Sequence, residues 1–470
     1  MNRLKQTVLL ILGFLLVETT HAAVNTTTGS GNWTNAATWS DGIPSSDDDV
    51  YIQSGHTVTI NGLATNQINS LSITGTLTHA DNSTEPAQHK IILKIEGNLT
   101  IVAGGKIDVQ GLGYDAGNGP GYHTGTASMK GGAYGGEGRG YNDNDEHISA
   151  QLSTGNTYGS VKTPTYLGSG GSVSSGGGAV ILNVGGQTSL DGSIIADGVA
   201  GNRPGSGGSI YLTTGTLIGS GTNSVKGYCT GSTGGGGGGR IAVIVTNGMS
   251  TGNVTMQAWG GYNPATDVEG PYPAAAGTVF IKNMNDSYGR LIVDNHGSDT
   301  TRGGGYSRSY TGLDDDDYSD GVVTTNMFDA IIVTNYGLLF IDTNCVLDLS
   351  NNPQIVCDGT TNNPTAGILF AAPGKGGQIL FPASITLTNV MLWQVGTNQT
   401  TWTTDLTLGD GAVLSHEGHV TSFTRMHNRD QRRSHHWHER SDLRVGEWLR
   451  CRRRPRLRGR LEHIGRGLRR

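Results

Sequence analysis

The chain has 470 residues, of which 76 are glycine, more than twice the usual share of about 7% and without the Gly-X-Y period of collagen. Only 15% of the residues are charged, and a chain this poor in Leu, Lys and Glu is not mostly helical. The net charge is −6, but 16 of the 32 basic residues lie from Arg425 onward, beside five acidic ones. The body before Arg425 therefore carries about −17 (16 basic and 33 acidic residues), which excludes nucleic acid as a partner because phosphate binding needs clustered Lys and Arg.

The first residues have the pattern of an export signal. Arg3 and Lys5 precede an apolar run over residues 7–17, and small residues follow at 20–22. This pattern predicts a secretory signal peptide over residues 1–22. The apolar run is short for a bilayer span, and no later stretch approaches about 18 uninterrupted apolar residues. We therefore expect a secreted or cell-surface protein without a transmembrane segment.

Residues 23–80 are predicted to form an N-terminal β cap or lead-in. Val50, Ile52, Val58 and Ile60 alternate with polar residues, as side chains on half-buried strands do. The block also contains a pair of tryptophans, a Gly-Ile-Pro step, an Asp-rich step and a Gly-His-Thr-Val-Thr-Ile segment (Trp33 and Trp39, then residues 42–44, 47–49 and 55–60).

These features resemble the start of the extracellular domain named for its eight glycines, and also the N-terminal block of many bacterial secreted β-helix proteins. The resemblance implies an extracellular β structure. The simpler interpretation is that Trp33, Trp39 and His56 only pack together and close one end of a hydrophobic column.

The fold is predicted from a recurring unit in which an alternating apolar strand is followed by a turn, a second short strand and glycine. Its copies begin at residues 91, 180, 210, 241 and 279, and from the second copy to the fourth the period is about thirty residues. One unit cannot bury its apolar side chains alone, so copies must stack into a continuous core. We predict an all-β fold, a right-handed parallel β-helix over residues 81–300, with further rungs over 301–424.

A glycine-dense insertion interrupts this array at residues 113–178. It has few apolar side chains to offset the entropy of ordering. Close packing of its backbone against the flank of the solenoid, which only glycine permits, is the way in which it could be ordered. We expect a partly ordered loop layer.

Three Gly-rich segments extend the resemblance to known proteins. Residues 158–171, 207–212 and 236–242 are similar to the repeats of large secreted or autotransporter-like bacterial proteins. Those proteins are presumed to be adhesive or structural. The resemblance implies a fold and a location, and it implies no reaction.

The Arg-rich tail, residues 425–470, departs abruptly from the composition of the body. If the coding DNA were read one base later, Trp437 and Trp448 would both become glycine. In that frame residues 448–453 could encode Gly-Phe-Asp-Val-Asp-Gly, which is similar to residues 105–111. We hypothesise a frameshift, with a second Gly-rich array lost downstream. The alternative is a genuine cationic arm for anionic partners.

One acidic segment is a candidate calcium site. Five aspartates could supply the oxygen ligands that calcium prefers (Asp314, Asp315, Asp316, Asp317 and Asp320). The segment lacks the spacing of an EF-hand and its terminal Glu, so a solvated acidic loop is the preferred interpretation. Asp143, Asp145 and Glu146 present the same choice.

The cysteines offer one possible disulfide and no zinc site. In an exported chain Cys345 could be oxidised with Cys357, since their spacing suits one turn or adjacent turns of a solenoid. The remaining cysteines are Cys229 and Cys451, and the body contains no Cys-x-x-Cys or His-x-x-x-His spacing.

The sequence assigns no catalytic or cofactor-binding residue. Basic residues of the body are scattered without a shared motif, among them Lys94, Lys106, Arg203, Lys226, Arg240 and Lys282. Several tyrosines stand among glycines, where we expect them to be exposed and where they could stack on sugar rings (Tyr122, Tyr134, Tyr141, Tyr262, Tyr272 and Tyr306).

Two functions remain open. The first is a secreted or cell-surface structural or adhesive β-solenoid without catalytic activity, which contacts extracellular polysaccharide or cell-surface components. The second is a parallel β-helix that binds or cleaves polysaccharide. A groove in which carboxylates, a basic residue and aromatic rings converge would favour the second function, and a smooth Asn/Thr/Gly face would favour the first.

Overall fold

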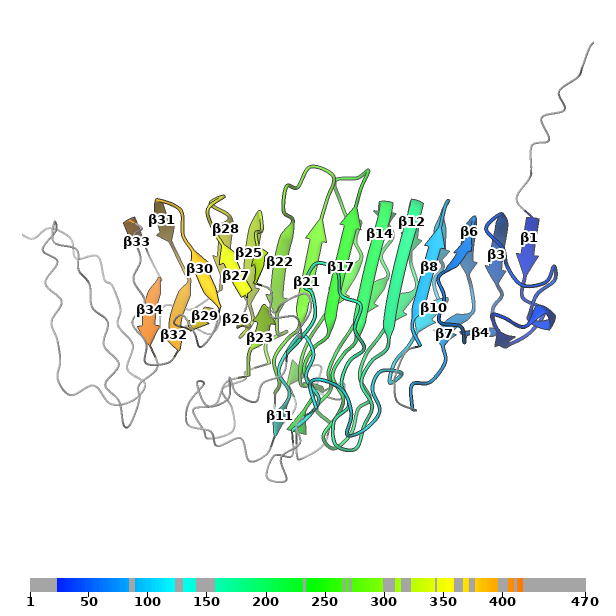
Figure 1. Ribbon diagram of the computed structural model, residues 1–470, viewed down its shortest axis with the longest axis horizontal. Helices are drawn as coiled ribbons and strands as arrows, with labels where there is room; N and C mark the ends of the chain where they lie inside the picture. The colour runs from blue at the N-terminus through cyan, green and yellow to red at the C-terminus, as the bar shows by residue number, and fades with distance from the viewer. Residues whose placement is uncertain are drawn as a thin grey trace, which may run out of the picture.

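The molecule is an elongated stack of β-strands. A computed structural model describes residues 23–83, 89–122, 130–140, 157–230, 234–263, 265, 268–269, 273–298, 309–313, 323–342, 345–358, 367–371, 377–395, 405–409 and 412–416. Strand β1 (Ala23–Thr26) lies at one end of the long axis and β34 (Val413–His416) at the other, and the strands of the main sheets follow broadly in chain order between them, whereas β11 (Arg139–Gly140) lies out of this order (Figure 1). A short 3-10 helix, η1 (Ala36–Thr38), is the one helical element in these ranges, and no helix among them has the length and apolar character needed to cross a membrane.

Two sheets form the walls of the first part of the stack. In spatial order, the first sheet contains β1, β3 (Asp48–Ile52), β6 (Ser70–Ile73), β9 (Leu99–Ile101), β12 (Ala179–Leu190), β14 (Ser209–Ile218), β17 (Arg240–Val245), β21 (Thr278–Lys282), β22 (Arg290–Asp294), β25 (Ala330–Thr334) and β28 (Gln354–Cys357), with β8 (Ile91–Ile95) beside β12 and β5 (Asn66–Ile68) beside β8. The second sheet contains β18 (Thr255–Gln257), β15 (Thr222–Ser224), β13 (Ser193–Ile195), β10 (Lys106–Asp108), β7 (Thr76–His79), β4 (Thr57–Ile60) and β2 (Gly31–Asn32).

Further sheets continue the stack toward β34. The third contains β23 (Thr311–Leu313), β26 (Leu338–Ile341), β29 (Gly367–Ala371), β32 (Met391–Val395) and β34, and the fourth contains β24 (Thr324–Asn326), β27 (Cys345–Asp348) and β30 (Gln378–Leu380). Strands β31 (Ser384–Leu387) and β33 (Asp405–Leu408) form a parallel pair. Two small antiparallel pairs complete the described strands: β11 (Arg139–Gly140) with β16 (Gly234–Gly235), and β19 (Tyr262–Asn263) with β20 (Val268–Glu269).

The predicted repeat appears as parallel strands stacked in register. Val180, Ile210 and Ile241 lie directly opposite one another on β12, β14 and β17, at steps of 30 and 31 residues (180 to 210, then 210 to 241). All three side chains are fully buried, and burying an aliphatic side chain of this size contributes about 1.5–3 kcal/mol. The all-β prediction and the parallel stacking are confirmed, and the arrangement is consistent with a parallel β-helix.

The stack consists of two hydrophobic columns. The first column, β1 to β21, encloses a core cluster that runs from Trp33 to Ile281. Strand β22 then pairs antiparallel with β21, whereas the other neighbouring pairs described in the first sheet are parallel. From Leu291 and Val293 onward the buried side chains belong to the second column, β22 to β34. Ala242 joins this second cluster from β17, so the sheet is buried on both faces at the junction.

The tryptophan pair closes the beginning of the first column. Trp33 and Trp39 are buried, their rings meet edge to face with centroids 5.1 Å apart, and Trp39 Nε1 donates to Trp33 O at 2.9 Å. Both rings belong to the first core cluster. The packing interpretation of these two residues is confirmed.

Two described segments of the glycine-dense insertion pack as a buried layer, which we call the glycine layer (residues 130–140 and 157–178). Gly135 N and Gly136 N donate to Gly238 O at 3.1 and 2.9 Å, and Gly312 N donates to Gly135 O at 3.1 Å. A Cβ on Gly135 would lie 2.5 Å from Gly239 O, so a larger residue could not approach so closely. The layer therefore links β17, in the first column, to β23, in the second.

Arg240 stands at the centre of this link. Its side chain is fully buried, and the guanidinium donates from Nε to Tyr158 O at 3.0 Å, from Nη1 to Thr278 Oγ1 at 3.2 Å and from Nη2 to Gly312 O at 3.1 Å. It also lies 5.5 Å from the ring centroid of Tyr134. The expectation that Tyr134 is exposed was wrong: the ring is fully buried, its centroid lies 4.6 Å from that of Tyr158, and its hydroxyl is hydrogen-bonded to Ser209 Oγ at 2.7 Å.

The three described cysteines are buried, and none of them forms a disulfide bond. Cys345 lies on β27 and Cys357 on β28, in different sheets, and Asn326 Nδ2 donates to Cys345 Sγ at 3.3 Å. The disulfide that their spacing permitted is therefore not formed. Burial raises the pKa of the Cys357 thiol to about 12, which keeps it protonated.

Candidate functional site

Four rungs of the second sheet end in related hexapeptides. Their sequences are Lys-Ile-Asp-Val-Gln-Gly, Ser-Ile-Ile-Ala-Asp-Gly, Thr-Asn-Ser-Val-Lys-Gly and Thr-Met-Gln-Ala-Trp-Gly (residues 106–111, 193–198, 222–227 and 255–260). The fourth residue of each is buried Val or Ala, and its N–H continues the parallel ladder: Val109 N donates to Ile195 O, Ala196 N to Ser224 O and Val225 N to Gln257 O, each at 2.8 Å.

This alignment places the fifth residues on successive turns at one edge of the column. We call these four side chains the turn ladder: Gln110, Asp197, Lys226 and Trp259. The glycines that follow the first three donate their N–H groups to the ladder residue of the next rung, from Gly111 to Asp197 O at 3.0 Å in the first case. The fourth, Gly260 N, donates to Asn295 Oδ1 at 3.2 Å. The backbone is thus nearly the same at every rung, while the ladder side chains differ in charge and shape.

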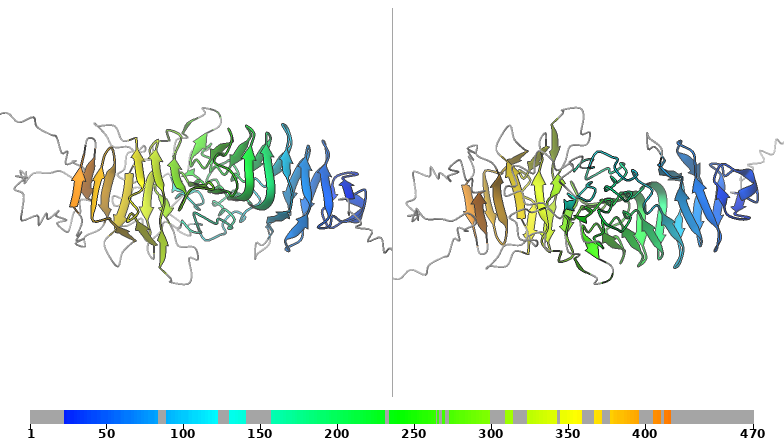
Figure 2. Two further views of the ribbon diagram at one scale, coloured as in Figure 1. Left: turned by 90° about the horizontal axis from the view of Figure 1, so that it is seen from above. Right: turned by 90° about the horizontal axis from the view of Figure 1, so that it is seen from below.

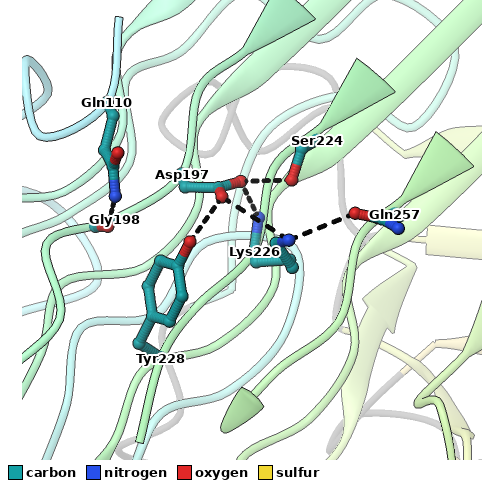
Figure 3. Close-up of polar contacts among 7 residues, drawn as sticks. All are labelled: Gln110, Asp197, Gly198, Ser224, Lys226, Tyr228 and Gln257. Carbon is teal, nitrogen blue, oxygen red and sulfur yellow. Dashed lines mark hydrogen bonds and ion pairs between the residues drawn. The ribbon is translucent and has the colours of Figure 1, made fainter. Parts of the chain in front are cut away.

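Asp197 is the buried anchor of the ladder. One carboxylate oxygen accepts from Ser224 Oγ at 2.6 Å and Lys226 N at 2.7 Å, and the other accepts from Tyr228 Oη at 2.8 Å (Figure 3). Burial raises the pKa of Asp197, while Lys226 and these hydrogen bonds act in the opposite direction. The same burial, followed by the nearby Asp197 carboxylate, raises the pKa of the Tyr228 phenol.

Lys226 joins the carboxylate to a group of aromatic rings. Its Nζ lies 3.9 Å from Asp197 Oδ2 and donates to Gln257 Oε1 at 3.1 Å (Figure 3). The same ammonium lies 4.8 Å from the ring centroid of Tyr262 and 5.5 Å from that of Trp259. Cation–π attraction and the ion pair together hold Lys226 in place.

We define the aromatic cluster as Tyr228, Trp259, Tyr262 and His296. His296 stacks on Trp259 with centroids 3.7 Å apart and planes 6° from parallel, and Tyr262 lies 5.3 Å from Trp259 and 6.0 Å from Tyr228. All four rings are half-buried, so each keeps part of its surface in contact with solvent. His296 reaches this position from the turn after β22, where its φ is 51° and its N–H donates to Asp294 Oδ1 at 2.8 Å.

A cleft of about 250 Å³ adjoins the aromatic cluster, and we call it the junction cleft. It lies where the second sheet ends at β18 while the first sheet continues through β21 and β22. No further strand of the second sheet therefore covers the core side chains of the last rung. Its lining is mostly apolar, with Trp259 and Asp294 at the rim (the others are Thr251, Val254, Met256, Ala258, Gly277, Val279, Ile281 and Ile292). Figure 2 shows this change from one column to the next from above and below.

The candidate residues predicted from the sequence fall mostly elsewhere. Asp314, Asp315, Asp316, Asp317 and Asp320 lie outside the described residues, so the calcium hypothesis stays a prediction. The same holds for Asp143, Asp145 and Glu146, and for Tyr141, Tyr272 and Tyr306. In the part of the chain that the structure describes, no three His, Cys, Asp or Glu side chains gather closely enough to hold a metal ion.

The structure brings together two residues that the sequence treated separately. In the sequence Lys226 is one of several scattered cations and Tyr262 one of several tyrosines among glycines, yet the Lys226 ammonium lies 4.8 Å from the ring centroid of Tyr262. Asp197, Trp259 and His296 were missed. Aligning the four hexapeptides would have shown that the fifth position varies in charge and shape between a Val or Ala and an invariant Gly, and this was the available signal.

Comparison with known proteins identifies one segment. Residues 38–107 match the G8 domain, the domain named for eight glycines, so the chain contains a G8 domain that extends from η1 to β10. No curated protein and no solved structure shows significant similarity to the chain. The resemblance of the N-terminal block is confirmed for this domain, and the wider resemblance to autotransporter-like surface proteins stays a prediction.

Proposed function

We propose that the protein is a secreted or cell-surface right-handed β-solenoid that adheres by binding polysaccharide and does not catalyse a reaction. The observation that carries the proposal is the half-buried aromatic cluster beside Lys226 and the junction cleft. Aromatic faces combined with a few fixed polar groups are the usual chemistry of an oriented small-ligand site.

The hand of the solenoid follows from the connections between parallel strands. Right-handed crossovers are strongly preferred when strands of one sheet run parallel. At the junction of the columns the strand direction reverses between β21 and β22, and the buried face of the sheet changes as well. Each change alone would reverse the hand, so together they preserve it, and we assign the same right hand to both columns.

A polar outer face supports a display role for the remaining surface. Outward positions of the second sheet lie opposite one another in register and carry mostly short polar side chains (Thr57, Thr76, Lys106, Ser193, Thr222 and Thr255). This is the smooth face expected of a structural solenoid. The aromatic cluster interrupts it at one end of the first column, which makes that end the binding region.

The hydrogen bonds of Asp197 support binding rather than cleavage. Glycoside hydrolysis needs two carboxyl groups able to act on the scissile bond and on water or the sugar. Asp197 accepts three hydrogen bonds within the fold and is 3% exposed, so it orients Lys226 and Tyr228 rather than reaching a substrate.

The test is affinity electrophoresis of the full chain through gels containing neutral, acidic or amino-sugar polysaccharides. We expect retardation in at least one of these gels. The variant His296→Asn removes the ring and keeps a residue that tolerates positive φ, and it should weaken binding about three- to tenfold, the value of one aromatic contact.

The matched control is Tyr51→Ala, which removes an exposed ring on β3 in the G8 domain, far along the column. It should bind like the unmodified chain. If new reducing ends are released during incubation, the protein cleaves polysaccharide and the proposal of binding without catalysis is wrong. If no polysaccharide retards the chain, the proposal is refuted.

A further inference from the structure

We propose that the junction cleft recognises the protonated amines of an amino-sugar polysaccharide, with Asp294 as their counter-ion. The inference rests on the proposed polysaccharide binding and names the chemical class of the ligand. It follows from a carboxylate, an indole ring and an apolar floor that meet in one cleft.

Asp294 is a carboxylate without a cationic partner. Its Oδ1 accepts from His296 N and from Asn335 Nδ2, both at 2.8 Å, and these neutral donors fix the orientation of the group. Among the residues that the structure describes, no Lys or Arg forms a salt bridge with it. Its negative charge therefore remains available to a ligand at the rim of the cleft.

The walls of the cleft suit an ammonium group carried on a sugar ring. Trp259 lines the cleft and offers the ring quadrupole that attracts cations, while Met256 and Ile292 supply an apolar surface. Lys226, which already contacts Trp259, has Asp197 as its own counter-ion at 3.9 Å and so does not neutralise Asp294. A carboxylate and an aromatic ring that line the same cleft bind an ammonium more strongly together than either group does alone.

The charge of the whole body favours the same class of ligand. Before Arg425 the chain carries 33 acidic and 16 basic residues. A negative surface raises the local concentration of a polycation and repels a polyanion. The cleft therefore provides the specific contact, and the body provides long-range attraction.

The experiment compares two soluble β-linked glucosamine oligosaccharides of equal length, one with free amines and one fully N-acetylated, by calorimetric titration into the full chain at a pH at which the amines are protonated. We expect the free-amine form to bind at least about tenfold more tightly. Asp294→Asn, which keeps the shape and the Oδ1 acceptor, should remove most of this preference and leave only the part that the charge of the body contributes. The control Asp191→Asn, on an exposed outer turn, should retain it.

The pair of ligands keeps the test independent of how well a variant folds. Equal affinity of the unmodified chain for both oligosaccharides would overturn the assignment of amines while leaving aromatic binding of polysaccharide intact. A preference that is as large in Asp294→Asn as in the unmodified chain would also overturn it. If neither oligosaccharide binds and no polysaccharide retards the chain, the proposed function fails as well.

Discussion

Replacing Arg240 with methionine tests whether the glycine layer holds the two columns together. The guanidinium donates to two backbone carbonyls, Tyr158 O and Gly312 O, and to Thr278 Oγ1, from a position with no solvent exposure. Hydrogen bonds from a charged donor contribute about 1.5–3 kcal/mol each, and the buried acceptors would lose this donor without gaining water. Methionine keeps most of the apolar stem, so we expect a loss of at least about 3 kcal/mol from these bonds.

Denaturant unfolding followed by circular dichroism measures this loss as a shift of the midpoint. The control is Lys94→Met, which removes a half-exposed cation paired with Glu96 at 2.6 Å on the surface. Such a pair contributes about 0–1 kcal/mol, so the control should unfold almost like the unmodified chain. If Arg240→Met also remains within about 1 kcal/mol of the unmodified chain, the role assigned to Arg240 is wrong.

Three further predictions concern other buried positions. Asn223 lies between Ile194 and Met256 with no hydrogen-bond partner for either amide atom, so Asn223→Val should raise the unfolding free energy by about 1–3 kcal/mol in the same assay. Burial lowers the pKa of His79 from 6.5 to about 4, so the folded protein favours the neutral imidazole. The free energy of unfolding should therefore be unaffected by His79 above pH 6.5 and should fall by about 3 kcal/mol as the pH is lowered to 4. Thermal melts over a pH series should show this decline in the unmodified chain and not in His79→Asn. A Cβ at Gly277 would lie 1.6 Å from Gly239 O, so Gly277→Ala should cost at least about 2 kcal/mol, whereas Gly29→Ala, with nothing within 4 Å, should melt like the unmodified chain.

The stacking of strands was predictable because it depends on the alternation of apolar residues within each repeat. Alternating apolar residues at thirty-residue spacing leave few ways to exclude water other than piling one unit on the next, and Val180, Ile210 and Ile241 do so in register. The reversal at β21–β22 was not predictable, because apolar alternation continues through it. Ile292 faces the first core and Leu291 the second, and alternation alone does not say which face will be buried.

The sequence offered backbone packing of the glycine-dense insertion as a possibility without deciding it, and it did not predict the aromatic cluster. Glycine-rich composition describes a solvated loop and a backbone-packed layer equally well, and only the approach of Gly135 to Gly239 O distinguishes them. The aromatic cluster is assembled from turns of separate rungs, and His296 comes from beyond the reversal. Residues gathered by stacking are visible in the sequence only after the repeats have been aligned correctly.

Hydrogen–deuterium exchange of the full chain, with and without the polysaccharide that retards it most, locates the binding region on the column. We predict slower exchange in peptides covering residues 255–263 and 290–298, which carry Trp259, Tyr262, Asp294 and His296, with little change in the G8 domain at residues 38–107. Protection confined to the G8 domain or to the outer face of the second sheet would place the binding region elsewhere and contradict the account.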